Sequence, residues 1–146
     1  MSISQVGSNS KAPRSPGATP PAERMVLVVD DEPMVLEVTG DMLAVLGFSA
    51  LLCASGQQAI ELFERRHPQI DLAIIDLTMP DMDGAETIRR LRQIDPSLKV
   101  ILSSGYGRER LAVEILGPEC DAFIQKPYSL DALSSKIKDT LSACKR

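Results

Sequence analysis

Long hydrophobic runs and clusters of basic residues are both missing from this sequence of 146 residues. No apolar run approaches the roughly 20 residues that a membrane-spanning helix needs, and the N-terminus lacks the hydrophobic segment of a secretory signal. We therefore expect no membrane segment in this chain, and a cytoplasmic location. No block rich in lysine and arginine occurs and the net charge is −4, so we expect no direct contact with nucleic acid.

Cysteine and histidine are scarce. Cys53, Cys120 and Cys144 are odd in number and match no metal-binding or redox spacing, so we expect free intracellular thiols. The single histidine, His67, precedes Pro68 in an expected turn, which favours an exposed side chain over a catalytic one. By contrast, the hydrophobic content of 44% and the charged content of 25% are ordinary for a globular protein. The length suits one domain.

The first 24 residues differ in composition from the rest of the chain. They are rich in serine, proline and glycine and have few apolar side chains that could build a core. Such a segment cannot bury enough surface to offset its conformational entropy. We therefore expect a disordered leader or linker over residues 1–24, followed by one folded domain over residues 25–143.

Short apolar runs alternate with longer amphipathic stretches in the remainder of the chain, which is typical of alternating strands and helices. The expected strands are Met25–Val29, Phe48–Leu52, Leu72–Asp76, Lys99–Ser103 and Asp121–Gln125. The expected helices run from Pro33 to near Gly47, from Ser55 to about Arg66, from Asp83 to Asp95, from Glu109 to Leu116 and from Ser129 to Leu141. This order predicts an α/β fold, a flavodoxin-like doubly wound (βα)5 domain with a parallel sheet in the order 2-1-3-4-5.

Apolar spacing within the helices predicts which of their faces are buried. In the first helix the expected buried residues are Val35, Val38, Met42 and Val45. In the last helix they are Leu130, Leu133, Ile137 and Leu141. Ser55 and Gln58 have the spacing of a capping box, which predicts the start of the second helix.

Polar residues stand directly after four of the expected strands. The first strand ends in Asp30-Asp31-Glu32, the third in Asp76, the fourth in Ser103-Ser104-Gly105 and the fifth in Lys126-Pro127. Open α/β folds bind their ligands at the carboxyl ends of parallel strands. Taken alone, Asp76 could be a turn or helix cap, or it could be a nucleophile or metal ligand.

The three aspartates Asp30, Asp31 and Asp76 are expected to converge at this edge of the sheet. Their mutual repulsion would raise their pKa values unless a cation were present. A hard divalent cation such as Mg²⁺ relieves this repulsion, because it prefers oxygen ligands. Acids that merely cap helices would explain one of the three but not the cluster.

The order of these strand-end residues resembles the receiver domain of two-component response regulators, over roughly Met25 to Leu141. The resemblance implies that Asp76 is the phosphoacceptor and that Asp30 and Asp31 are the acidic pair. It implies a Mg²⁺ site formed by Asp30, Asp31, Asp76 and the main-chain carbonyl of Thr78.

The resemblance also implies roles for the later strand ends. Lys126 and the Ser104 hydroxyl would bind oxygens of the phosphoryl group, and the Lys126–Pro127 peptide would be cis. Ser103 and Ser104 are adjacent, but Gly105 favours Ser104, because the family has a small residue after its hydroxyl. Phe123 matches the family's switch aromatic, which would respond to Ser104, although a lone strand phenylalanine could equally be plain core.

By this resemblance the chain accepts a phosphoryl group from a histidine kinase or a histidine phosphotransfer domain. It would catalyse only its own modification and is not expected to be an enzyme with a separate substrate. A phosphatase of the haloacid-dehalogenase type would need a second Asp two residues after Asp76, where Thr78 stands. A nucleotide-binding module would need a glycine-rich loop after the first strand, where the acids stand.

Several expectations concern partners. Exposed apolar residues of the first helix, such as Met34 or Val38, are candidate anchors for the kinase. The last two helices are the expected surface for a homodimer, if one forms. Nothing after the domain is expected to bind DNA, and the chain could be a stand-alone regulator or the receiver of a hybrid sensor kinase.

Overall fold

The computed structural model describes residues 25–77, 84–105 and 121–142. Several features expected from the sequence lie outside these residues. They are the leader at 1–24, Thr78, the capping residue Asp83, the helix at 109–116, Cys120, Cys144 and the last residue of the expected domain, 143.

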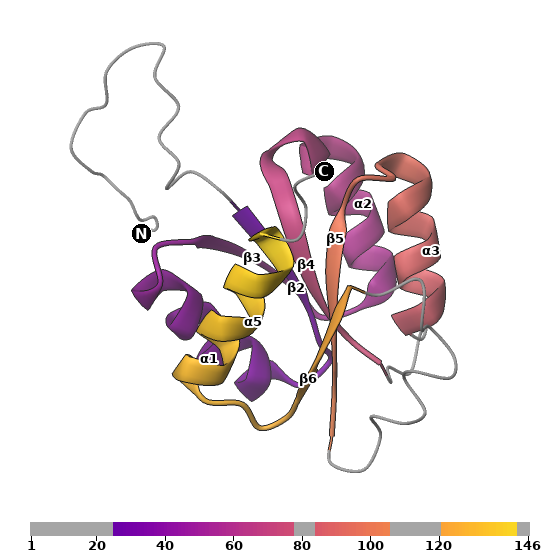
Figure 1. Cartoon of the computed structure of the whole chain (residues 1–146). Coiled ribbons are helices and arrows are strands. Elements are labelled where there is room, and N and C mark those ends of the chain that lie inside the picture. Colours follow the sequence, from indigo (N-terminus) through magenta and orange to yellow (C-terminus); the bar gives the residue numbers. More distant parts are fainter. Residues whose placement is uncertain (1–24, 78–83, 106–120, 143–146) are drawn as a thin grey trace, which may run out of the picture.

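A five-stranded parallel sheet forms the centre of the molecule (Figure 1). Its strands are β2 (Met25–Val29), β3 (Ser49–Cys53), β4 (Ile70–Asp76), β5 (Lys99–Ser104) and β6 (Ala122–Gln125). The spatial order β3-β2-β4-β5-β6 corresponds to 2-1-3-4-5 in chain order, with every neighbouring pair parallel. The predicted α/β architecture and strand order are therefore confirmed. β4 is buried at six of its seven positions, as its nearly continuous apolar run predicts.

Helices cover both faces of the sheet (Figure 1). One face is covered by α1 (Pro33–Val45) and α5 (Leu130–Ser142), and the other by α2 (Gly56–Arg66) and α3 (Gly84–Ile94). A short 3₁₀ helix, η2 (His67–Gln69), leads from α2 into β4. Two hydrophobic clusters result, and their largest fully buried side chains include Phe63, Leu91 and Leu102 in one and Leu43, Leu72 and Leu133 in the other. In the described part of the chain no helix is long and apolar enough to cross a bilayer.

The helix ends follow the signals in the sequence. Pro33 occupies the first turn of α1, and Gly47, with φ of 94°, follows its last turn in a left-handed conformation that suits glycine. Ser55 caps α2 by accepting a hydrogen bond from the Gln58 N–H at 3.1 Å. The Gln58 side chain accepts from the Ala54 N–H instead of completing the expected bond to Ser55.

The predicted buried face of α1 was wrong at two of its four residues, whereas Met42 packs against the core as predicted and Val35 is partly buried. Val38 is 47% exposed and Val45 is 72% exposed, whereas Thr39 and Leu43 are buried. Leu36, Met42 and Leu46 pack beside them, partly buried. Because α1 has apolar residues around most of its circumference, the apolar spacing alone does not identify the face that meets the sheet.

The last helix agrees with its predicted stripe in part. Leu133 and Ile137 are buried and Leu141 is partly buried, but Leu130 is 37% exposed. Leu130 is the first residue of α5, and Ser129 caps this helix by accepting a hydrogen bond from the Ala132 N–H at 3.1 Å. The first turn thus extends past the edge of the core.

Candidate functional site

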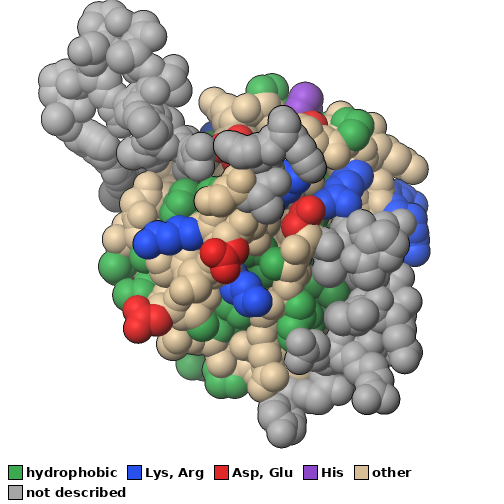
Figure 2. All heavy atoms as spheres, viewed as in Figure 1, with side chains coloured by type: hydrophobic (Ala, Val, Ile, Leu, Met, Phe, Trp, Pro, Cys, Tyr) green, Lys and Arg blue, Asp and Glu red, His purple; other side chains and the backbone are tan. Residues whose placement is uncertain are grey.

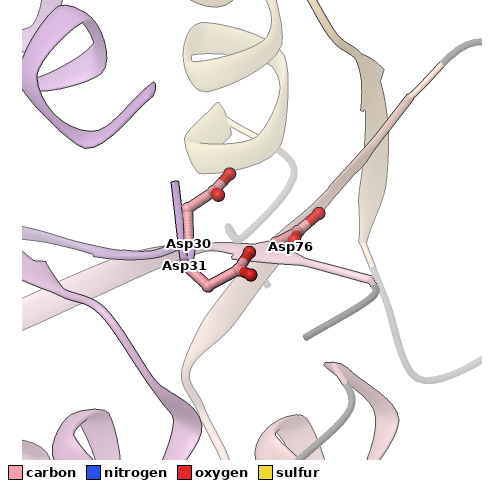
Figure 3. A group of neighbouring side chains, drawn as sticks. All are labelled: Asp30, Asp31 and Asp76. Atoms are coloured by element: carbon pink, nitrogen blue, oxygen red, sulfur yellow. The ribbon is translucent and has the colours of Figure 1, made fainter. Parts of the chain in front are cut away.

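Three aspartate side chains meet at the carboxyl edge of the sheet, on its two central strands. Asp30 and Asp31 directly follow β2, and Asp76 is the last residue of β4 (Figure 3). Each of the three offers a carboxylate oxygen, and these oxygens lie within 4.8 Å of one another. The register of the two strands explains this closeness, because Val29 pairs with Ile75 and the next residues are Asp30 and Asp76.

The three acids differ in their exposure to solvent. Asp30 is 2% exposed and Asp76 is 5% exposed, whereas Asp31 is on the surface. The Asp30 carboxylate accepts a hydrogen bond from the Glu32 N–H at 2.9 Å, and the Asp30 N–H donates to the Cys53 carbonyl at 3.0 Å. These bonds hold Asp30 in place at the entry to α1.

Lys126 lies between the two buried acids. Its ammonium nitrogen donates a hydrogen bond to Asp30 Oδ2 at 3.0 Å and lies 3.3 Å from Asp76 Oδ1. The carboxylate of Glu32 is more distant, at 3.9 Å, and largely exposed. Lys126 follows β6 at the edge of the sheet, so its long side chain crosses toward the ends of the two central strands.

The electrostatics of Asp76 and Lys126 reflect this arrangement. Burial, together with the charges of Asp30 and Asp31, raises the pKa of Asp76 from 3.8 to about 6, although Lys126 opposes the shift. Burial would lower the pKa of Lys126, but its hydrogen bond to Asp30 and the charges of Asp76 and Asp30 outweigh burial and raise it. Repulsion between the acids, expected from the sequence, thus contributes to the pKa shift of Asp76, with burial as the larger cause.

Ser103 and Ser104 are both buried at the end of β5. Ser104 lines the same cavity as Asp76 and Lys126. Its carbonyl accepts a hydrogen bond from the Lys126 N–H at 2.7 Å, while the Ser103 carbonyl accepts one from the Leu77 N–H at 2.8 Å. The backbone at this point therefore links the ends of β4, β5 and β6.

Phe123 is half-buried on β6, directly opposite Leu102 of β5. Both pack in the cluster beneath α2 and α3. Because strand side chains alternate between faces, Ser104, two residues after Leu102, shares the face of Phe123. The Lys126–Pro127 peptide is cis.

A cavity of about 660 Å³ opens above the carboxylates. Its polar lining includes Asp31, Asp76, Ser104 and Lys126, and its apolar lining includes Met34, Val35, Val38 and Pro127. Met34 is 75% exposed. Figure 2 shows hydrophobic side chains at the surface beside acidic and basic ones, on the side of the molecule formed by α1 and α5.

The donor set fits a hard divalent cation. It consists of carboxylate oxygens, which Mg²⁺ and Ca²⁺ prefer, and contains no soft sulfur ligand. The raised pKa of Asp76 also fits, because a cation would favour its ionised form. Thr78, the fourth ligand expected from the sequence, lies outside the described residues.

Two interactions at the site were not predicted from the sequence. One is the ion pair of Lys126 with Asp30, whose strands are separated in the sheet by β4 and β5. The other is a hydrogen bond between the hydroxyls of Thr39 and Tyr128, 2.6 Å apart. Thr39 is a polar residue on an otherwise apolar face of α1, a pattern that can be recognised in the sequence. It was missed because this face was not the one predicted to be buried.

Comparison with known proteins gives a consistent set of similarities. Residues 26–138 match the family model of the response regulator receiver domain. The chemotaxis protein CheY of Bacillus subtilis is 31% identical over 118 residues, which cover 80% of this chain and 97% of CheY. The sensor kinase CckA of Brucella abortus is 34% identical over 116 residues, which cover 80% of this chain but only 12% of CckA.

Solved structures show the same similarity. A response regulator receiver domain protein from Clostridium thermocellum has a TM-score of 0.77 and 26% identity, covering 84% of this chain and 97% of that chain. A CheX–CheY–BeF3–Mg²⁺ complex from Borrelia burgdorferi has a TM-score of 0.75 and 27% identity, covering 81% of this chain and 89% of that chain.

Proposed function

Because this chain belongs to the response regulator receiver domain family of two-component signalling, we propose that it accepts a phosphoryl group on Asp76 from a phospho-histidine. The observation that carries this proposal is the position of Asp76. Its carboxylate is buried at the end of β4, beside two further acids and 3.3 Å from a lysine ammonium group. The proposed receiver domain covers residues 25–143.

In the proposed reaction an oxygen of the ionised Asp76 carboxylate attacks phosphorus in line with the leaving group. The new O–P bond forms as the P–N bond to the donor imidazole breaks, and the electron pair of that bond stays on the imidazole nitrogen. The product on Asp76 is an acyl phosphate. The chain catalyses its own modification in this scheme and has no separate substrate to turn over.

Asp30, Asp31 and Asp76 are proposed to hold Mg²⁺, with the carbonyl of Thr78 completing the set. When bound, the cation would neutralise charge on the transferring group and help to orient it. The CheX–CheY complex crystallised with BeF3 and Mg²⁺ supports this choice of ion. The exposed Asp31 and the buried Asp76 are proposed as the main ligands, and Asp30 is proposed to act partly through water.

Lys126 and Ser104 are proposed to bind oxygens of the phosphoryl group. The Lys126 ammonium group already lies beside Asp76, so a small movement away from Asp30 would bring it to the new negative charge. The Ser104 hydroxyl, which lines the same cavity, would donate a second hydrogen bond. Movement of Ser104 toward the phosphoryl group would then leave room for Phe123 on the same face of the sheet.

The donor is proposed to be a histidine kinase or a histidine phosphotransfer domain. His67 is the single histidine. It lies just before the start of β4, whereas Asp76 is the last residue of that strand, so the two lie at opposite ends of β4. Met34 and Val38 on α1 are exposed beside the cavity and are proposed to contact the donor. Such apolar contacts, more than the acids, would determine which kinase is accepted.

Acetyl phosphate with Mg²⁺ tests the proposed chemistry without a kinase. We expect intact-mass measurement to show one added phosphoryl group on the wild type and none on Asp76→Asn. Chelation of Mg²⁺ should abolish labelling of the wild type. Equal labelling of the wild type and Asp76→Asn would contradict the assignment of Asp76.

A titration with Mg²⁺, followed by backbone NMR, tests the metal site separately. Signals of residues near Asp30, Asp76 and Ser104 should shift together. Shifts confined to another part of the protein would contradict the proposed ligands.

A further inference from the structure

The hydroxyl groups of Thr39 and Tyr128 form a direct hydrogen bond, with their oxygens 2.6 Å apart. Thr39 is 1% exposed on the face of α1 that meets the sheet. Tyr128 is half-buried between the Lys126–Pro127 peptide and the start of α5. The bond therefore joins α1 to the segment that carries Lys126, although the two residues are 89 positions apart in sequence.

The same two segments are also joined by charge. Lys126 donates to Asp30, just before α1, at 3.0 Å. In the proposed reaction this ionic link changes, because Lys126 turns toward the phosphoryl group on Asp76. The Thr39–Tyr128 bond contains no charged group and no reacting atom, so breaking the ionic link does not directly disrupt it.

The position of Tyr128 connects this bond to the chemistry. Thr39 and Tyr128 line the same cavity as Asp76, Ser104 and Lys126. Tyr128 is two residues from Lys126. Among the described strands, β6, which ends just before Lys126, is an edge strand that pairs with β5 alone. A movement of the Tyr128 backbone away from α1 would therefore be transmitted to Lys126.

We propose that Thr39 and Tyr128 are a positioning pair that holds the Lys126 segment against α1 during phosphoryl transfer to Asp76. This inference rests on the function proposed above. In this role the pair acts through Lys126 and not by direct contact with the phosphoryl group or the metal. Without the hydrogen bond the ammonium group spends less time beside Asp76, and labelling slows while the acidic cluster keeps its form.

Isosteric substitutions test the pair. Thr39→Val and Tyr128→Phe each remove one hydroxyl group and nearly preserve shape, and Thr39→Ser keeps the hydroxyl. We expect each of the first two to lower the second-order rate constant for labelling by acetyl phosphate about three- to tenfold, the effect of one hydrogen bond. The double variant should be no slower than the slower single variant, because both hydroxyls act through the same bond. Thr39→Ser should keep most of the wild-type rate.

Thr140→Val is a matched control. Thr140 is another buried threonine, 4% exposed, and lies roughly 15 Å along α5 from its first turn. This variant should change the melting temperature but not the rate of labelling. All rates are measured at saturating Mg²⁺ and well below every melting temperature, and the Mg²⁺ affinity of each variant is measured in parallel.

The outcomes separate this inference from the function on which it rests. Wild-type rates in Thr39→Val and Tyr128→Phe, or additive losses in the double variant, would overturn the positioning role alone. A loss of rate matched by an equal loss of Mg²⁺ affinity would also overturn it. If the wild type takes up no phosphoryl group, the proposed function fails and this inference fails with it.

Discussion

The ammonium nitrogen of Lys126 lies 3.3 Å from Oδ1 of Asp76, and yet the pKa of Asp76 is raised to about 6. Burial and the neighbouring charge of Asp30 outweigh the attraction of the lysine, which Asp30 shares. The ionised form of Asp76 is therefore less favourable in the metal-free protein than in the unfolded chain, although it still predominates at pH 7. The same features favour a bound cation and an attacking carboxylate.

This relationship predicts a pH-dependent effect of Asp76→Asn on stability. A carboxyl group whose pKa is raised by folding destabilises the fold as pH rises from its unfolded value of 3.8 through its folded value of about 6. Only the wild type carries this destabilising carboxyl group. Without metal, the free energy of unfolding of Asp76→Asn minus that of the wild type should therefore increase by up to about 3 kcal/mol between these two pH values. Urea denaturation at several pH values measures the difference, and saturating Mg²⁺ should reduce it. A difference that does not change with pH would contradict the raised pKa.

Gly84 predicts a second effect on stability. A Cβ atom at this first residue of α3 would lie 2.7 Å from the Asp76 carbonyl oxygen, closer than such contacts allow. Gly84→Ala should therefore lower the free energy of unfolding by about 1–3 kcal/mol, because α3 and the end of β4 must move apart. Gly105→Ala is the control, since a Cβ at Gly105 meets nothing within 4 Å. Equal stability of the two variants would show that the close approach at Gly84 is relieved without cost.

Ser104→Ala should separate acceptance of the phosphoryl group from the switch. We expect this variant still to be labelled by acetyl phosphate, because Asp76, the other acids and Lys126 remain. The NMR signals of the Phe123 ring should lose most of the change that phosphorylation causes in the wild type. Ser103→Ala is the adjacent control and should keep that change. A full response of Phe123 in Ser104→Ala would contradict the coupling between the two residues.

Met34 and Val45 allow a matched test of the docking surface. Both are on α1 and similarly exposed, at 75% and 72%, but only Met34 lines the cavity near Asp76. The measured quantity is the rate of transfer from a cognate kinase divided by the rate of labelling by acetyl phosphate. Met34→Glu should lower this ratio at least tenfold, and Val45→Glu should leave it near the wild-type value. Equal losses with both donors in Met34→Glu would assign Met34 to the fold and not to the partner.

Much of the fold was predictable from the sequence because the strands are short apolar runs that end in polar residues. Asp30, Asp76, Ser104 and Lys126 lie at the carboxyl ends of strands. Because all the strands are parallel, these ends lie along one edge of the sheet. Alternating strands and helices of ordinary length then leave few topologies open.

Features that depend on side-chain packing were not predictable in the same way. The buried face of α1 was predicted only in part, because the exposed Val38 and Val45 are as apolar as Leu36, Met42 and Leu43, which pack against the sheet. The Lys126–Asp30 ion pair and the Thr39–Tyr128 hydrogen bond join segments that are distant in the chain. Such contacts depend on how the long side chains extend across the sheet edge, and residue spacing does not encode this.

The central claim, that Asp76 carries the phosphoryl group, is tested most directly by reductive trapping. Borohydride reduces an acyl phosphate on aspartate to homoserine, so peptide mapping after labelling by acetyl phosphate and Mg²⁺ identifies the modified residue. We predict homoserine at position 76 and at no other aspartate, and its loss when Mg²⁺ is chelated. Homoserine at position 30 or 31, or its absence from every peptide of a protein shown by mass to be phosphorylated, would contradict the account.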